Sequence, residues 1–219
     1  MSGFTGVWRM LLIAAVAATG FTGCGSDEDN PANNSGGGSY ETVPIGGNKW
    51  MKKNLNVKTD DSWCYNNSAD SCKKYGRLYT WNAAKKACQS VGMRLPTNDE
   101  WDDLVTAAGG VRDASSKLKS KKGWDGMYSD GNSNTDEFGF SALPGGMCAP
   151  VPDNMADLFP DMFPDGILFI GVVELGHWWT ATEDSDENAY NRRMGSGSFW
   201  VEEFSYPKNS GLSVRCVAN

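Results

Sequence analysis

RLPTNDEWDDLVTAAGG, the stretch at residues 94–110, carries the clearest helix signal in this sequence. Thr97 and Glu100 have the spacing of a capping box, in which each side chain accepts a hydrogen bond from the backbone N–H of the other residue. The apolar residues that follow recur at helical spacing on one face, and two glycines then end the pattern. The stretch predicts a helix over residues 98–108 that packs one face into a core.

A second helix is predicted before this one, because Trp81, Ala84 and Cys88 fall at i, i+3 and i+7. The last third of the sequence reads as β structure, with strand-like runs separated by turn residues. These runs are residues 177–182 (HWWTAT), 189–194 (AYNRRM), 199–204 (FWVEEF) and 212–217 (LSVRCV). Helices early and strands late predict an α+β fold. The Gly- and Pro-rich middle predicts short strands and a surface excursion.

The N-terminus has the features of an export signal. Arg9 precedes an apolar run over residues 10–18, which is shorter than the roughly 20 residues that a transmembrane helix needs. Small residues lead to Gly23-Cys24, which resembles the lipobox of bacterial lipoproteins. We predict that residues 1–23 are removed and that Cys24 carries lipid, which would hold the chain on a membrane. The alternative is an ordinary secretory signal followed by an incidental cysteine.

The residues after Cys24 indicate location and domain organisation. Acidic residues follow closely, as in the export tag of some surface lipoproteins, and no Asp adjoins the cysteine, so we expect the outer membrane or cell surface. Residues 24–42 predict a disordered tether, and residues 43–219 suit one domain. The mature chain has 19 basic and 27 acidic residues, a net charge of about −8, so nucleic acid is an unexpected partner.

Five cysteines follow Cys24, and an oxidising compartment favours two disulfides and one thiol. Cys88 lies on the buried face of its helix and Cys216 on the inward face of the final strand, so we expect a bridge between them. Cys64 and Cys72 flank a short turn and predict the second bridge, which leaves Cys148 over. A zinc site is the competing interpretation, but the chain has no Cys-x-x-Cys pair and only one histidine.

Six segments, taken in order, resemble the Fibrobacter succinogenes major paralogous domain, a family of secreted and lipid-anchored bacterial proteins. They are residues 50–55 (WMKKNL), 75–81 (YGRLYTW), 94–97 with 100–101 (RLPT, EW), 138–146 (FGFSALPGG), 177–182 (HWWTAT) and 214–217 (VRCV). The resemblance implies a fold like that of C-type lectins and formylglycine-generating (sulfatase-modifying) enzymes. In that fold two helices precede a curled antiparallel sheet, and a disulfide links the first helix to the last strand.

Neither the formylglycine-generating activity nor calcium-dependent sugar binding is expected for this chain. The formylglycine-generating enzymes need a redox-active cysteine pair near the C-terminus, and this chain has none there. Calcium-dependent lectins bind sugar through an acid-Pro-Asn or Gln-Pro-Asp loop. The nearest string here is residues 151–154 (VPDN), in which valine offers no oxygen ligand.

Catalysis by a nucleophile and a base would have to use His177, which lies beside two tryptophans in a strand-like run. We expect a packed, hydrogen-bonded core histidine instead. Glu183, Asp184, Asp186 and Glu187 cluster just after this run, but four acids in one turn predict a solvated loop rather than an acid/base pair. The chain is therefore expected not to be an enzyme, with a hydrolase as the alternative.

A Gly-rich stretch offers the hard oxygen ligands that calcium prefers. The residues concerned are Asp125, Asp130, Asn132, Asn134 and Asp136. Their spacing differs from that of an EF-hand loop. The stretch predicts either a structural calcium site or a plain turn.

Eight tryptophans remain after removal of the signal, and four of them suggest a surface that stacks on sugars. Neighbours in a strand point to opposite faces, so one of Trp178 and Trp179 should be exposed unless both faces of the sheet are covered. Trp124 and Trp200 lie in segments that could reach solvent. We therefore expect a non-catalytic surface module that binds polysaccharide, with a structural or protein-binding role in the cell envelope as the alternative.

Overall fold

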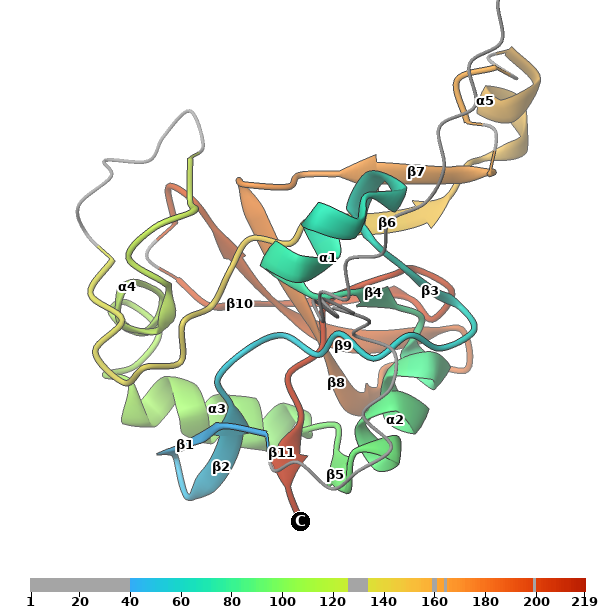
Figure 1. Cartoon of the computed structure of the whole chain (residues 1–219). Coiled ribbons are helices and arrows are strands. Elements are labelled where there is room, and N and C mark those ends of the chain that lie inside the picture. The colour runs from blue at the N-terminus through green and yellow to red at the C-terminus, as the bar shows by residue number, and fades with distance from the viewer. Residues whose placement is uncertain (1–39, 126–133, 159–160, 164, 199) are drawn as a thin grey trace, which may run out of the picture. The chain divides into compact units, whose positions relative to one another are not determined.

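The computed structural model describes residues 40–125, 134–158, 161–163, 165–198 and 200–219 (Figure 1). Its helices are η1 (Tyr65–Asn67), α1 (Ala69–Tyr75), α2 (Trp81–Ser90), α3 (Asn98–Ala107), α4 (Ala114–Leu118) and α5 (Asp153–Leu158). Its strands are β1 (Thr42–Ile45), β2 (Asn48–Met51), β3 (Ser62–Trp63), β4 (Leu78–Tyr79), β5 (Met93–Arg94), β6 (Met147–Pro150), β7 (Ile167–Ile170), β8 (Leu175–Glu183), β9 (Asn188–Gly195), β10 (Glu202–Pro207) and β11 (Val217–Ala218).

The strands form small antiparallel sheets, which together with the helices confirm the α+β prediction. One sheet has the order β1-β2-β11-β5 and a second has the order β10-β9-β8, while β3 pairs with β4 and β6 with β7. Because β11 pairs with both β2 and β5, the C-terminal end of the chain closes the first sheet. Within the described ranges, no helix is long and apolar enough to cross a bilayer.

Helix α3 forms as the sequence predicts. The Thr97 hydroxyl accepts from the backbone N–H of Glu100 at 3.2 Å, and the Glu100 carboxylate accepts from the N–H of Thr97 at 2.8 Å. Gly109 and Gly110, with φ of 105° and 82°, end the helix in a conformation that glycine adopts without steric cost. The buried side chains of α3, among them Trp101, then pack into the core.

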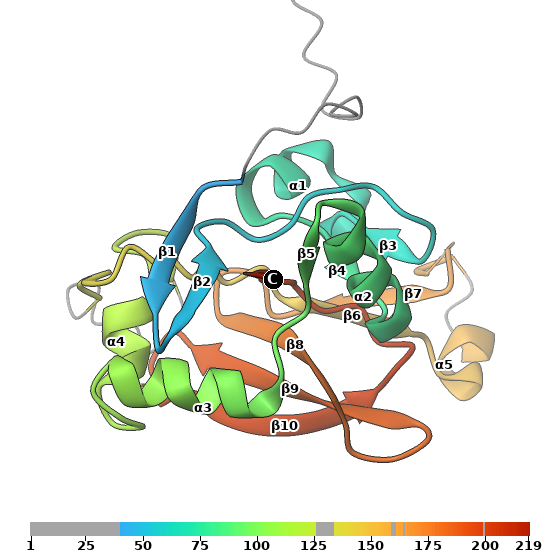
Figure 2. The same cartoon turned by 90° about the horizontal axis from the view of Figure 1, so that it is seen from below.

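Strand β8 separates two parts of the core, because each of its faces is covered. Trp178 belongs to a cluster with Trp50, Trp101 and Phe140, whereas Trp179 belongs to the cluster around α2. Both indoles are fully buried. Figure 2 shows α2 and α3 on either side of β8. The expectation that one of these two rings would be exposed is therefore wrong, and the alternative of a sheet covered on both sides holds.

The final segment departs from the predicted strand. A strand over residues 212–217 with Cys216 facing inward would place Ser213 and Arg215 on the outer face, but all six residues are buried. Only β11 is regular strand, because the backbone here bonds to a different element at nearly every step. Leu212 pairs with Tyr79, and the N–H of Ser213 donates to the carbonyl of His177. The third predicted strand also begins later than expected, at Glu202.

Both predicted disulfides are present. Cys88 in α2 is bridged to Cys216, which ties that helix to the C-terminal segment, and Cys64 is bridged to Cys72 in α1. Cys148 is a free thiol that is only 1% exposed, and burial raises its pKa to about 12. This thiol is therefore protonated and inert at neutral pH.

Candidate functional site

Three of the four tryptophans predicted to face a sugar are buried. Trp124 is 3% exposed, and Trp178 and Trp179 are fully buried. Each indole N–H is also used inside the protein: Trp124 donates to Ala142 O, Trp178 to the Asn54 side chain and Trp179 to Tyr79 O. A platform built from these rings is therefore excluded, since their faces are packed and their polar atoms are satisfied.

Trp200 is the exception, with 58% of its surface exposed just before β10. Two half-buried rings follow on β10, Phe204 and Tyr206, whose centroids stack at 6.3 Å. The guanidinium of Arg193 lies 4.2 Å from the centroid of the Phe204 ring, so a cation already covers one face of that ring. Of the predicted sugar-facing rings, only Trp200 is open to a ligand.

The calcium prediction falls partly outside the described residues, because Asp130 and Asn132 lie in the undescribed stretch. Among the residues that are described, no group of three or more His, Cys, Asp or Glu side chains could hold a metal ion. Asp136 is instead committed to Ser141, whose N–H and hydroxyl both donate to its carboxylate, at 2.7 and 2.5 Å. Calcium binding by this stretch stays a prediction.

His177 is a core histidine, as predicted. It is 1% exposed, and its Nδ1 lies 3.2 Å from Oδ1 of Asn191, which assigns the proton to Nδ1. Burial lowers its pKa to about 4, so the ring is neutral at physiological pH. Its Nε2 has no hydrogen-bond partner within the described part of the chain. Glu183 ends β8, and Asp184, Asp186 and Glu187 lie in the turn that follows. All four acids are exposed, as expected for a solvated turn.

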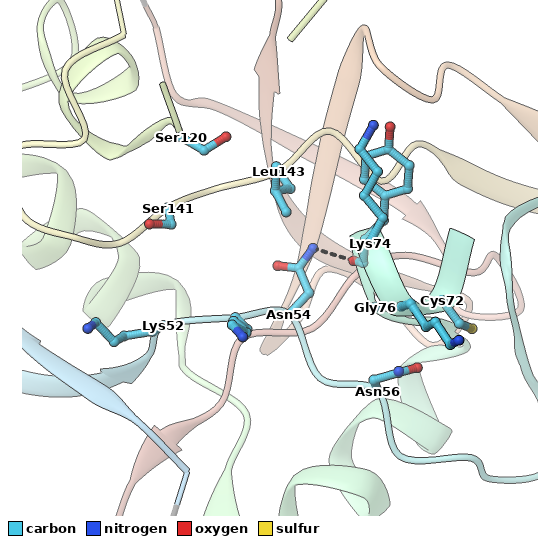
Figure 3. A pocket seen from close by; sticks show the side chains of 12 residues that line it. Lys52, Asn54, Asn56, Cys72, Lys74, Gly76, Ser120, Ser141 and Leu143 are labelled. Atoms are coloured by element: carbon cyan, nitrogen blue, oxygen red, sulfur yellow. Dashed lines mark hydrogen bonds between the residues drawn. The ribbon is translucent and has the colours of Figure 1, made fainter. Parts of the chain in front are cut away.

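A pocket of about 410 Å³ lies between the segment after β2 and helix α1 (Figure 3). Its lining comes from four separate stretches of the sequence. The lining residues are Lys52, Lys53, Asn54, Asn56, Cys72, Lys73, Lys74, Tyr75, Gly76, Ser120, Ser141 and Leu143. Four of these are lysines and none is acidic, in a chain whose net charge is −7. This composition makes the pocket a concentration of positive charge on an acidic protein.

Asn54 ties the pocket to the core. Its amide nitrogen donates to the carbonyl of Tyr75 at 2.8 Å, the contact drawn in Figure 3. Its amide oxygen accepts from Trp178 Nε1 at 2.9 Å and from Arg215 Nε at 2.7 Å. The side chain of Asn54 is therefore fixed at both ends, and it joins α1 to the segment after β2.

The buried guanidinium of Arg215 bonds to Asn54 from the core side of the pocket lining. Arg215 is fully buried and donates to the carbonyls of Met51, Phe140 and Ser141, at 2.8, 2.5 and 2.9 Å. Burial lowers its pKa to about 9, which the negative charge of Asp136 partly opposes. The guanidinium thus stays charged at neutral pH, and its partners within hydrogen-bond distance are neutral oxygens.

Another part of the pocket lining has an unusual backbone conformation. Ser141 has φ of 51°, in the left-handed region that residues other than glycine seldom occupy. Its N–H and hydroxyl are held by Asp136 and its carbonyl by Arg215. Since three of its polar atoms are fixed, the position of Ser141 in the pocket is set before any ligand arrives.

Sequence reasoning missed this pocket, although its signals were in view. The pair Lys52-Lys53 lies within a segment that marks the family resemblance, and Lys73-Lys74 is a second basic pair in an acidic chain. Neither pair is notable alone, because basic pairs are common on solvated surfaces. Only the fold shows that the two pairs line the same hollow.

The comparison with protein families identifies the chain. The model of the Fibrobacter succinogenes major domain matches residues 43–218, nearly all of the part that the structure describes. The chain belongs to this family. No curated protein and no solved structure matches it. The matched range of this chain includes both disulfides and all the residues that line the basic pocket.

Proposed function

We propose that this chain is a lipid-anchored, non-catalytic binding module of the bacterial cell surface, and that its basic pocket holds acidic groups of an extracellular polysaccharide. The observation that carries the proposal is the set of four lysines around a hollow without acidic residues. The amide of Asn56 adds hydrogen-bonding capacity for sugar hydroxyls. The hydroxyls of Ser120 and Ser141 donate inside the protein, but their oxygens can still accept from a ligand.

Electrostatics favours an anionic polymer over a neutral one. Each exposed lysine contributes little by itself, but several charges around one concave site act together on a ligand that carries many carboxylates. Lys52 is partly neutralised by Glu41, at 3.8 Å, which leaves Lys53 and the pair on α1 as the more available cations. Trp200 could add a stacking contact elsewhere on such a polymer.

The binding test uses the mature chain with a uronic-acid polysaccharide and a neutral glucan. Replacing both lysines of α1, Lys73→Gln with Lys74→Gln, should weaken binding of the acidic polymer about three- to tenfold. The same change at Lys49 and Lys58, exposed and outside the pocket lining, alters net charge equally and should leave affinity nearly unchanged. Equal losses in both variants, or equal binding of the two polymers, would contradict the proposal.

Anchoring is tested separately from binding. Mass spectrometry of the envelope-associated protein should find an N-terminus at Cys24 with an acyl mass on the thiol, and Cys24→Ala should leave the protein unprocessed and unacylated. An unmodified chain that begins at another residue would remove the lipid anchor from the proposal. Binding by the pocket does not depend on this result.

The finer fold assignment is also part of the proposal. A C-type-lectin-like architecture is supported by two features, α2 and α3 preceding the sheet of β8, β9 and β10, and the bridge from α2 to the C-terminal segment. An experimental structure superposed on calcium-dependent lectins and formylglycine-generating enzymes tests it. A strand order that cannot be superposed would leave only the α+β class.

A second role, binding of an envelope protein, is favoured by exposed apolar side chains on the excursion of β6, α5 and β7, seen at the upper right of Figure 1. Leu158 is 72% exposed, Met162 64% and Ile170 41%. Exposed apolar groups gathered on one excursion are typical of protein contacts. Cross-linking from this excursion to one envelope protein, together with no polysaccharide binding, would favour this role over the first.

A further inference from the structure

The two disulfides differ in exposure. Cys64 is partly exposed, and Cys72, although only 6% exposed, lines the basic pocket, whereas Cys88 and Cys216 are both fully buried. Thiol–disulfide exchange requires an incoming thiolate to reach a sulfur atom of the bridge. In the folded protein, therefore, the Cys64–Cys72 bridge is open to a reagent and the Cys88–Cys216 bridge is not.

A fixed cation lies beside both sulfur atoms of the accessible bridge. Nη1 of Arg77 is 3.3 Å from Cys64 Sγ and 3.5 Å from Cys72 Sγ. The guanidinium is held in place by Ser62, whose carbonyl accepts from Nη2 at 2.7 Å and whose hydroxyl accepts from Nε at 3.0 Å. A neighbouring guanidinium stabilises a cysteine thiolate, and a more stable thiolate is a better leaving group in exchange.

The segment that this bridge closes is also held by contacts that do not need the bridge. Tyr65 is buried and packs against Phe169, with ring centroids 5.3 Å apart. The side-chain amide of Asn67 donates to the carboxylate of Asp165 at 2.8 Å. These contacts can persist when the bridge opens, so the fold should survive its reduction.

From these contacts we infer that the Cys64–Cys72 bridge is a site of thiol–disulfide exchange for a dithiol reductant, with Arg77 stabilising the departing thiolate. One thiolate of the reductant attacks Cys64 Sγ, the S–S bond breaks, and Cys72 leaves as a thiolate beside the guanidinium. The second thiol of the reductant then attacks the reductant's first sulfur in the mixed disulfide, and Cys64 is released as a thiolate. The dithiol is oxidised to a cyclic disulfide, and its two protons end on the two protein cysteines.

The test applies graded dithiothreitol to the full folded chain, followed by alkylation and peptide mass spectrometry. Cys64 and Cys72 should be labelled at a reductant concentration at least about tenfold below that needed for Cys88 and Cys216. Circular dichroism should show the fold retained over that range. Reduction of both bridges over one range, or of neither short of unfolding, would overturn the inference.

Variants of Arg77 test the cation itself. Arg77→Gln keeps a hydrogen-bonding side chain but removes the charge, and should slow reduction of the Cys64–Cys72 bridge about tenfold. Arg77→Lys should restore part of the rate, and Arg112→Gln, at an exposed position, should not change it. A merely structural arginine gives the opposite result, since loosening the segment would speed reduction. An Arg77→Gln rate equal to or above that of the unchanged protein would therefore contradict the role of the charge. This inference does not rest on polysaccharide binding.

Discussion

Arg215 shows how one side chain can join separate segments of the chain. Its guanidinium donates to carbonyls of Met51, Phe140 and Ser141 and to the side chain of Asn54. These acceptors are buried or half-buried, and no water replaces the donor cheaply once it is removed. The residue therefore stabilises the fold and shapes the pocket at the same time.

Replacing this residue should be costly. Arg215→Met keeps much of the volume but leaves several carbonyl oxygens unpaired, so we expect the free energy of unfolding to fall by about 3–5 kcal/mol. Urea unfolding followed by tryptophan fluorescence measures it. Arg112→Met, at an exposed position, is the control and should change stability little. A loss as small as that of the control would show that the buried hydrogen bonds are replaceable.

His177 predicts a pH dependence of stability. A histidine in the unfolded chain titrates near 6.5, whereas burial lowers the pKa in the folded chain to about 4. Between these values the unfolded state binds more protons, so stability rises with pH. The contribution is complete above about pH 6.5 and is lost as the pH falls towards 4, by up to about 3 kcal/mol.

Stability can also change with pH for reasons unrelated to His177. The test therefore compares how steeply the free energy of unfolding changes with pH in two proteins. Free energies of unfolding of the wild-type chain and of His177→Gln are measured between about pH 4.5 and 7. The variant should show a shallower rise with pH, whatever its absolute stability. Parallel curves would mean that His177 does not set the dependence.

Helix α3 begins with a capping box made by residues of the helix itself and its N-cap. Thr97→Ala removes the hydroxyl that accepts from Glu100 N–H and should lower the free energy of unfolding by about 1 kcal/mol. Thr106→Ala, at an exposed position of the same helix, is the matched control. Thermal unfolding of both variants distinguishes the cap from a general effect of alanine, and a loss of the same size in both would contradict a role for the cap.

Elements with local signals could be predicted from the sequence, and those with distant partners could not. The capping box and the glycines of α3 lie within a few residues of the helix that they define. The final segment lacks such signals, because the alternation of Leu212, Val214 and Cys216 presumes one partner strand. In the structure Leu55, Tyr79 and His177 all bond to this segment, so its intervening polar residues are buried too.

The candidate site could not be predicted from the sequence either, because its residues meet only in the folded molecule. The pocket brings together residues 52–56, helix α1 and Ser141, and its four lysines become one feature only through the fold. The tryptophans mislead for a related reason. Whether Trp178 or Trp179 reaches solvent depends on whether α2 and α3 cover both faces of β8. The residues around the pair carry no signal for that coverage.

The Cys88–Cys216 bridge acts on the whole molecule, because it joins residues 128 positions apart and closes most of the described domain into a loop. In the chain-entropy model, a loop of this length contributes about 4–5 kcal/mol, whereas the loop of Cys64 and Cys72 contributes about 2–3 kcal/mol. Replacing both cysteines of each pair by alanine should therefore destabilise the long-loop variant by roughly 2 kcal/mol more than the short-loop variant. Urea unfolding under non-reducing conditions measures both losses, and Cys148→Ala provides the control for loss of a buried sulfur. If the two double variants lose equal stability, loop closure is not what the longer bridge contributes, and the packing of its buried sulfurs between α2 and the C-terminal segment must account for its effect.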